Sequence, residues 1–228
     1  MRRFFFFYFI ILLFISSLSF AHVEHYKKVR LLSYQLFLND KLIGHHDFNF
    51  KYEGDLLYVN SEGNFKVDKL GVVLMDYKTS AEEVYKKNQL IKFNSKTKQN
   101  KKNKFANILI QKNQFYIDGS SFKGQVSKDT IIGSWWNHQI IKSSKQISPI
   151  SGSVNPQKVK FLGKKRLKIG EKTYDALHFH FLSDDEKDLK KKKINIEVWY
   201  DEKTLLWIKS RYNNLGTWEY RLKKVING

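Results

Sequence analysis

The stretch INIEVWYDEKTLLWIKSRYNNLGTWEYRL, residues 194–222, decides the fold of this chain. It contains three runs in which apolar and polar side chains alternate, and it holds three of the five tryptophans. Such alternation places successive side chains on opposite faces of a β-strand. Between the runs lie Asp201-Glu202-Lys203-Thr204 and Asn213-Asn214-Leu215-Gly216, whose Asp, Asn and Gly favour tight turns. The stretch therefore predicts an antiparallel meander.

The register of the first hairpin in this meander stays open. A two-residue turn at Glu202-Lys203 places Trp207 on the face of Val198, whereas one more loop residue places it beside Trp199. A slip of one residue moves every side chain of a strand to the other face. The sequence alone therefore leaves open whether Trp199 and Trp207 stack.

Further β-like runs fill the chain upstream of this stretch. Turn signals such as Asn39-Asp40 and a short turn at Lys87-Asn88 recur about every 8–12 residues, which is the spacing of all-β sandwiches and barrels. We predict an all-β, mainly antiparallel fold, with a curved meander sheet that forms a half-barrel or a barrel-like sandwich. One segment differs, because Asp129-Thr130 is a helix-capping pair and Ile132, Trp135, Trp136 and Ile140 follow at helical spacing. We predict one short helix near residues 130–141, which acts as a plug in the core or as a lid over a cavity.

The N-terminus resembles an export signal. Two arginines precede an apolar run from Phe4 to Ile15, and small residues lead to Ala21. We predict a signal peptide over residues 1–21 and a single β domain over residues 22–228. The chain has no cysteine, which for an exported protein is typical of a bacterial periplasm, so we predict a periplasmic protein. The alternative is anchoring to the inner membrane by an uncleaved leader.

The net charge of +19 raises the question of anionic partners. Its densest run, KTKQNKKNK from Lys96 to Lys104, lacks the interleaved aromatic side chains that stack on bases. We interpret this run as a solvated loop, with contact to a membrane or polyanion as the alternative, and we expect no nucleic-acid partner. An anionic membrane surface remains a candidate partner.

No catalytic motif is visible, and we expect no cofactor. The chain contains no G-x-S-x-G, HExxH or Gly-rich phosphate loop, and without cysteine it has no thiol nucleophile. His178 and His180 share a strand face, and His45, His46 or His138 would have to complete a metal site with them. An ordinary polar strand face explains the pair more simply. Cleavage after Ala21 would expose His22, whose amine and imidazole could chelate copper.

Several short motifs follow one another along the chain: Tyr34, Asn39-Asp40, Ile43-Gly44-His45, Gly71, Tyr77, Glu83, Leu90, Thr97, Trp135-Trp136 and Trp199-Tyr200-Asp201. Their order resembles a family of exported proteobacterial proteins that is itself a domain of unknown function. That resemblance covers most of the chain after residue 21 and implies no catalytic residues.

A second resemblance concerns one hairpin. Val198-Trp199-Tyr200-Asp201, with Thr204 three residues on, is similar to a hairpin of periplasmic half-barrel carriers of lipids and lipoproteins. This resemblance implies a curved sheet with an apolar concave face. Together with an aromatic content of 15%, it suggests a non-enzymatic protein that binds a hydrophobic, lipid-like ligand. A fully packed structural module of the cell envelope and a His-based metalloprotein or enzyme are the alternatives. The candidate ligand-binding residues are Trp135, Trp136, Trp199, Trp207, Trp218 and Tyr220.

Overall fold

The computed structural model describes residues 24–184 and 194–228, so the predicted signal peptide and His22 lie outside the described residues. Two 3-10 helices, η1 (Glu24–Lys28) and η2 (His138–Lys142), accompany fifteen strands. The first eight strands are β1 (Val29–Leu38), β2 (Lys41–Glu53), β3 (Leu56–Lys69), β4 (Val72–Lys86), β5 (Gln89–Gln99), β6 (Lys102–Gln111), β7 (Gln114–Gly119) and β8 (Lys123–Ser127). The other seven are β9 (Ile131–Ile132), β10 (Lys145–Ile147), β11 (Val154–Ile169), β12 (Lys172–Ser183), β13 (Asn195–Asp201), β14 (Trp207–Asn213) and β15 (Thr217–Asn227).

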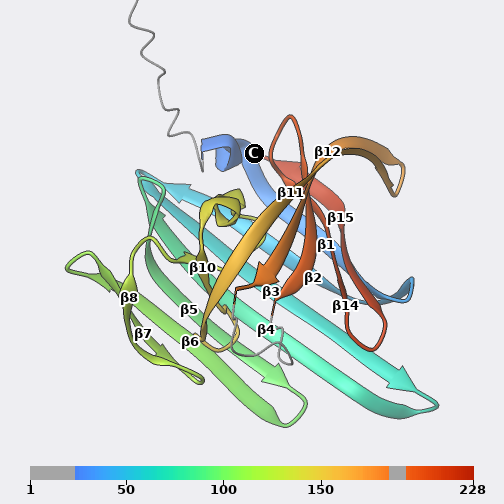
Figure 1. Ribbon diagram of the computed structural model, residues 1–228, viewed down its shortest axis with the longest axis horizontal. Helices are drawn as coiled ribbons and strands as arrows, with labels where there is room; N and C mark the ends of the chain where they lie inside the picture. Colours follow the sequence, from blue (N-terminus) through green and yellow to red (C-terminus); the bar gives the residue numbers. More distant parts are fainter. Residues whose placement is uncertain (1–23, 185–193) are drawn as a thin grey trace, which may run out of the picture.

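All fifteen strands form one sheet, in the order β8-β7-β6-β5-β4-β3-β2-β1-β15-β14-β13-β12-β11-β10-β9. Strand β1 lies in the middle because it pairs with both β2 and β15. The first meander runs outward from β1 to β8, whereas the second runs back toward β1 from β11 to β15, with β10 and β9 at the edge beyond β11. Every pair of neighbours is antiparallel except β9 and β10. The sheet curves, so that the strands of the second meander lie across one face of the first (Figure 1). The predicted all-β, barrel-like meander is confirmed.

Tight turns join the strands of the first meander. Both residues have a positive φ in Asn39-Asp40 (48° and 62°) and in Lys87-Asn88 (46° and 66°), as a two-residue hairpin turn requires. Asn and Asp tolerate this conformation because their short side chains bond to the nearby backbone. The two turns predicted from these residues are confirmed.

The register of the β13–β14 hairpin separates its two tryptophans. Tyr200 is the partner of Trp207, and an irregularity between Trp199 and Tyr200 shifts the pairing by one residue. Trp207 therefore shares a face with Tyr200 and stacks on Tyr34, with ring centroids 4.1 Å apart. Trp199 lies on the other face and stacks on His178.

The helix predicted near residues 130–141 is wrong. Ile131–Ile132 is a short strand, turns follow, and only His138–Lys142 winds into a 3-10 helix, which the side chain of Asn137 caps. The apolar spacing that suggested a helix reflects burial instead, since Ile132, Trp136 and Ile140 are all buried. We call residues 131–153, which contain β9, η2 and β10, the cover segment.

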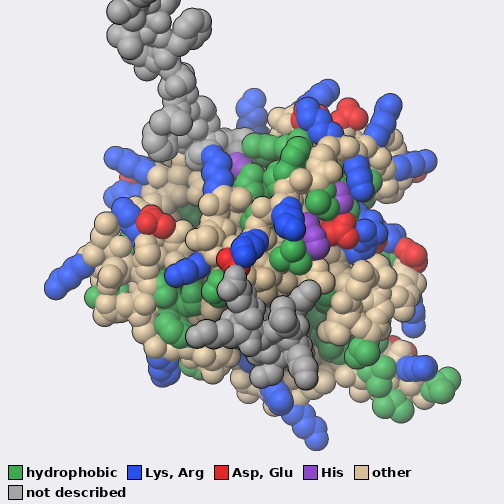
Figure 2. All heavy atoms as spheres, in the orientation of Figure 1, with side chains coloured by type: hydrophobic (Ala, Val, Ile, Leu, Met, Phe, Trp, Pro, Cys, Tyr) green, Lys and Arg blue, Asp and Glu red, His purple; other side chains and the backbone are tan. Residues whose placement is uncertain are grey.

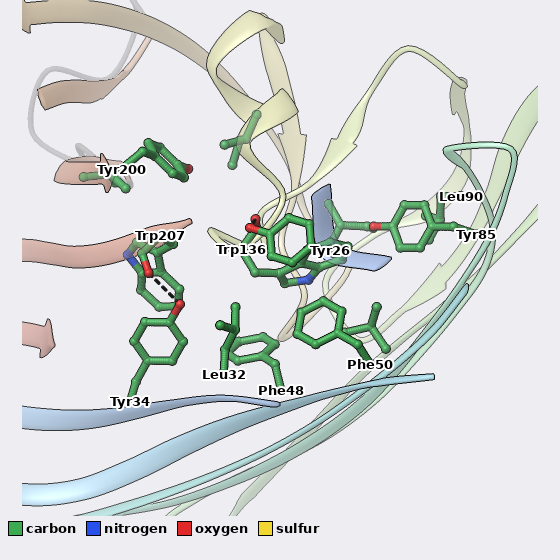
Figure 3. Packing of buried hydrophobic residues seen from close by; sticks show 14 of the residues in the cluster. Tyr26, Leu32, Tyr34, Phe48, Phe50, Tyr85, Leu90, Trp136, Tyr200 and Trp207 are labelled. Atoms are coloured by element: carbon green, nitrogen blue, oxygen red, sulfur yellow. Dashed lines mark hydrogen bonds between the residues drawn. The ribbon is translucent and has the colours of Figure 1, made fainter. Parts of the chain in front are cut away.

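The cover segment lies against the concave face and contacts both meanders. Trp136 is fully buried and packs edge-on against Tyr26, Phe50 and Tyr85 (Figure 3). The hydroxyl of Tyr26 donates to the carbonyl of Trp136, and from β13 the hydroxyl of Tyr200 donates to the carbonyl of Trp135 at 3.0 Å. These hydrogen bonds take up backbone carbonyls that a helix would otherwise use.

A buried carboxyl group holds the cover segment to β4. Glu83 is 1% exposed, and it accepts hydrogen bonds from Ser134 Oγ (2.7 Å), Trp136 Nε1 (2.9 Å) and the Tyr85 hydroxyl (2.5 Å). Burial raises the pKa of Glu83 above its ordinary value, because the charged form loses its hydration, while the three hydrogen bonds act in the opposite direction.

Glu83→Gln is expected to change how stability depends on pH. Since the folded state raises the pKa of Glu83, its contribution to stability is fully present below the ordinary pKa of 4.5 and is lost as the pH rises through the folded value. Denaturant unfolding of the wild type should therefore show a free energy that falls with rising pH relative to Glu83→Gln. The control is Glu82→Gln, which alters a carboxylate that pairs with Lys92 at the surface. Parallel curves of unfolding free energy against pH for the wild type and Glu83→Gln would contradict a raised pKa of Glu83.

Candidate functional site

A cavity of about 290 Å³ lies between the cover segment and the two meanders. Its walls come from β2, β3, β4, β11, β13, β14 and β15, from Ile194 just before β13 and from the cover segment, so it is the part of the concave face that the core does not fill. Residues that line it are His46, Phe48, Ser61, Tyr77, Thr79, Ala81, Gly133, Ser134, Trp135, Gln146, Ser148, Pro149, Ile150, Asn155, Ile194, Ile196, Trp207 and Tyr220.

Aromatic rings form much of the apolar wall. Trp207 lies 5.2 Å from Tyr220 between ring centroids and 6.1 Å from Phe48. The backbone at Trp207 is also held in place, because the Tyr34 hydroxyl donates a hydrogen bond to the Trp207 carbonyl at 2.7 Å (Figure 3). Trp135 packs edge-on against Phe181 on the other side. Rings of this kind present large, rigid apolar surfaces at low entropic cost.

His46 is the one titratable imidazole on the cavity wall. Its ring stacks on Phe48 with centroids 4.4 Å apart, and Gly63 allows this position, because a Cβ at Gly63 would lie 2.9 Å from the ring. Burial lowers the pKa of His46 to about 4, so the ring is neutral near pH 7, while Asp47 acts in the opposite direction. Within the described residues, neither His46 Nε2 nor the indole nitrogen of Trp207 has a hydrogen-bond partner.

Three of the six aromatic residues predicted to bind a ligand come together at the cavity: Trp135, Trp207 and Tyr220. Trp136, the neighbour of Trp135, is instead packed in the core and bonded to Glu83. Trp218 packs in a separate aromatic group, stacked on Tyr212 at 5.7 Å and edge-on to Phe65.

Trp199 lies on the opposite face of the sheet, in a charged cluster. It stacks on His178 with centroids 4.3 Å apart, and the cationic groups of Lys209 and Arg211 each lie 5.5 Å from its ring centroid. Glu197 joins the cluster through His178 Nε2 (2.7 Å) and Arg211 Nη2 (2.9 Å). Burial lowers the pKa of His178, although Glu197 acts in the opposite direction.

The two histidines predicted to share a strand face do so. His178 Nε2 lies 2.7 Å from Oε2 of Glu197, and His180 Nε2 lies 2.8 Å from the side-chain oxygen of Asn195. In residues 24–184 and 194–228, no group of three His, Asp or Glu side chains is arranged to hold a metal ion. The interactions of both histidines are those of a polar strand face.

Sequence reasoning missed His46, Phe48, Tyr77 and Ile150 as cavity residues. The alternation of His46, Phe48 and Phe50 predicted a strand, but a strand pattern does not tell a filled part of a core from a hollow one. The nearest signal was His46 itself, because it occupies a position where a third apolar residue would continue the alternation with Phe48 and Phe50.

The chain belongs to the family described as domain of unknown function DUF6134, whose model matches residues 34–223. Membership of a family of unknown function was expected from the short motifs, and it is confirmed. No match was found among curated proteins.

The fold is similar to a solved structure, the crystal structure of a beta-barrel-like protein of domain of unknown function DUF1849 from Brucella abortus. The TM-score is 0.61 at 10% sequence identity, and the match covers 89% of this chain and 98% of the other. At this identity the likeness concerns the fold alone. Among the described residues, no helix is long and apolar enough to cross a membrane.

His46→Gln is expected to remove an acid-sensitive contribution to stability. A histidine whose pKa is lowered from 6.5 to about 4 stabilises the fold fully above pH 6.5, and this contribution is lost as the pH falls toward 4. The loss for the wild type amounts to about 3 kcal/mol over that window. Denaturant unfolding at a series of pH values measures it. His45→Gln, a change of the exposed neighbour, should keep most of the wild-type pH dependence, because burial is the main cause of the lowered pKa of His46 and the charge of His45 adds less. A wild-type dependence in His46→Gln would contradict the assignment.

Proposed function

We propose that the protein binds a small hydrophobic or amphipathic ligand, such as a single acyl chain, in the cavity under the cover segment, and that it acts as a non-enzymatic binding or carrier protein. The observation that carries the proposal is the cavity itself, which leaves part of an apolar concave face unfilled. Protein interiors are packed as densely as organic crystals, so a partly open hollow of this size against the apolar core is a candidate binding site.

The lining suits an amphipathic molecule. Aromatic and aliphatic side chains such as Trp207, Tyr220 and Ile196 offer an apolar wall, while the polar groups of His46, Gln146 and other residues offer hydrogen bonds. A few polar groups in an apolar pocket orient a ligand and give it specificity. The unpartnered Nε2 of His46 is one such group.

The size limits the ligand to one slender chain. A volume of about 290 Å³ lies at the lower end of the range for small-molecule sites and matches about ten water molecules. Each methylene group moved from water into such a site contributes about 0.8 kcal/mol. An acyl chain of medium length therefore gains enough free energy from burial to bind, whereas a whole phospholipid is too large for the cavity.

The basic surface supports a role near anionic membranes. Figure 2 shows Lys and Arg side chains spread over the visible face. The predicted export signal would bring the protein to the cell envelope, where this surface favours contact with anionic headgroups. Contact of this kind would deliver or collect the ligand without any chemical step.

Ile150→Trp is expected to weaken ligand binding by about tenfold or more, because the larger ring enters the cavity and displaces the chain. Isothermal titration with dodecanoate measures the effect.

The control is Leu162→Trp, which makes a similar aliphatic-to-Trp change at a half-exposed position of β11 away from the cavity. Equal affinity in the two variants, or no binding of dodecanoate and of shorter or longer fatty acids by the wild type, would contradict the proposal and favour a packed structural module.

A further inference from the structure

A second hollow lies on the outer face of the first meander, on the side of the sheet away from the cover segment. It has a volume of about 660 Å³ and runs across five strands, β2 to β6. The side chains that point to this face alternate with buried or half-buried ones, such as exposed Lys96 and Lys98 on either side of buried Thr97. Outward residues that line the hollow are His45, Glu62, Asn64, Lys78, Ser80, Lys96, Lys98, Asn103, Phe105 and Asn107.

Strand register places three lysines together in this groove. Lys78 on β4 is the direct partner of Lys98 on β5, and Lys96 lies two residues along β5 from Lys98. Like charges directly opposite each other destabilise a sheet. None of the three lysines forms an ion pair with any described Asp or Glu, so the repulsion is not offset within the part of the chain that the structure describes. An anionic ligand would offset it.

Residues paired with the lysines across the strands supply further hydrogen-bonding groups. His45 pairs with Asn64, Asn64 with Lys78, and Lys98 with Asn103, so an imidazole and two amides flank the two cations across the sheet. His45 Nε2 already lies 3.3 Å from Asn64 Nδ2. Amides both donate and accept hydrogen bonds, which matches the hydroxyl groups of a sugar.

The neighbouring set of residues paired across the strands adds an aromatic surface and a carboxylate to the groove. Phe105 is the partner of Lys96 and borders the groove, and Glu62 lies in the same row through Ser80. A half-buried phenyl ring offers an apolar face to the C–H groups of a sugar ring. Glu62 can accept hydrogen bonds from hydroxyl groups, but it repels a continuous chain of phosphates.

We propose that this groove binds an acidic polysaccharide, a chain of sugars that carry carboxylate groups. Five strands at about 4.8 Å spacing span about 19 Å, which suits several sugar units laid across the strands. A concave groove fits a chain better than it fits a flat bilayer. The single phenylalanine differs from the successive aromatic platforms of single-stranded nucleic-acid sites.

This site also corrects the interpretation of residues 96–104. The run KTKQNKKNK is a hairpin and not a loop, because β5 continues to Gln99, β6 starts at Lys102, and residues 96–99 pair with 102–105. Two of its lysines are thereby held on one rigid face beside Lys78. The groove is separate from the cavity on the concave face, and its ligand does not depend on the function proposed above.

The test compares two variants that each lose three positive charges. Lys78→Gln with Lys96→Gln and Lys98→Gln should weaken binding to polygalacturonate by at least about tenfold at low salt, because charge-assisted contacts are lost. Lys160→Gln with Lys168→Gln and Lys172→Gln, at exposed sites on β11 and β12, should change the affinity by less than about twofold. Biolayer interferometry measures both, with neutral dextran as the uncharged comparison.

Several outcomes would overturn the proposal. They are equal losses in the two triple variants, equal binding of dextran, tighter binding of single-stranded poly(dT) than of polygalacturonate, and no binding of polygalacturonate by the wild type. Phe105→Ala tests the groove without changing charge and should also weaken binding, by about threefold or more. Thermal unfolding of every variant shows whether each one folds, and the lysine changes are expected to leave stability unchanged or raise it, since they remove repulsion.

Discussion

The hydrogen bonds that hold the backbone around Trp135 and Trp136 are the constraint on which the rest of the structure depends. Hydroxyl groups from Tyr26 and Tyr200, at opposite ends of the described chain, bond to two successive carbonyls of the cover segment. The buried carboxyl group of Glu83 takes the indole N–H of Trp136. An unpaired polar group at such a depth would cost about 1–3 kcal/mol, so the three contacts together specify where the segment lies.

The position of the cover segment divides the concave face into a filled part and a hollow part. Trp136 closes the core against Tyr26, Phe50 and Tyr85, whereas Trp135 faces the cavity beside Trp207 and Tyr220. The opposite face of the same strands is polar and carries the lysine groove. Because side chains alternate along a strand, one sheet presents an apolar site on one face and a cationic site on the other.

Local chemistry made the strands and turns predictable. Asn39-Asp40 and Lys87-Asn88 adopt the positive φ values that their residue types suggest, and the meander of residues 194–222 has the expected strands. The prediction of a helix near residues 130–141 was wrong because the apolar spacing indicates only which residues are buried. The side chains that bond to the backbone carbonyls of Trp135 and Trp136 lie 65 and 110 residues away in the sequence. The bulge beside Trp199 determines on which face of the sheet Trp207 lies, and no sequence pattern indicates this bulge. Whether inward aromatic rings fill a core or line a cavity depends on such long-range contacts, and so the candidate site was predictable only in part.

Mass spectrometry of molecules that co-purify with the full-length protein from its native cells tests the central claim most directly. The account predicts a stoichiometric amphipathic molecule with one slender apolar chain, which is lost from Ile150→Trp and retained by Leu162→Trp. A wild-type protein that carries no such molecule, and that fails to take one up from a mixture of fatty acids after delipidation, would contradict it.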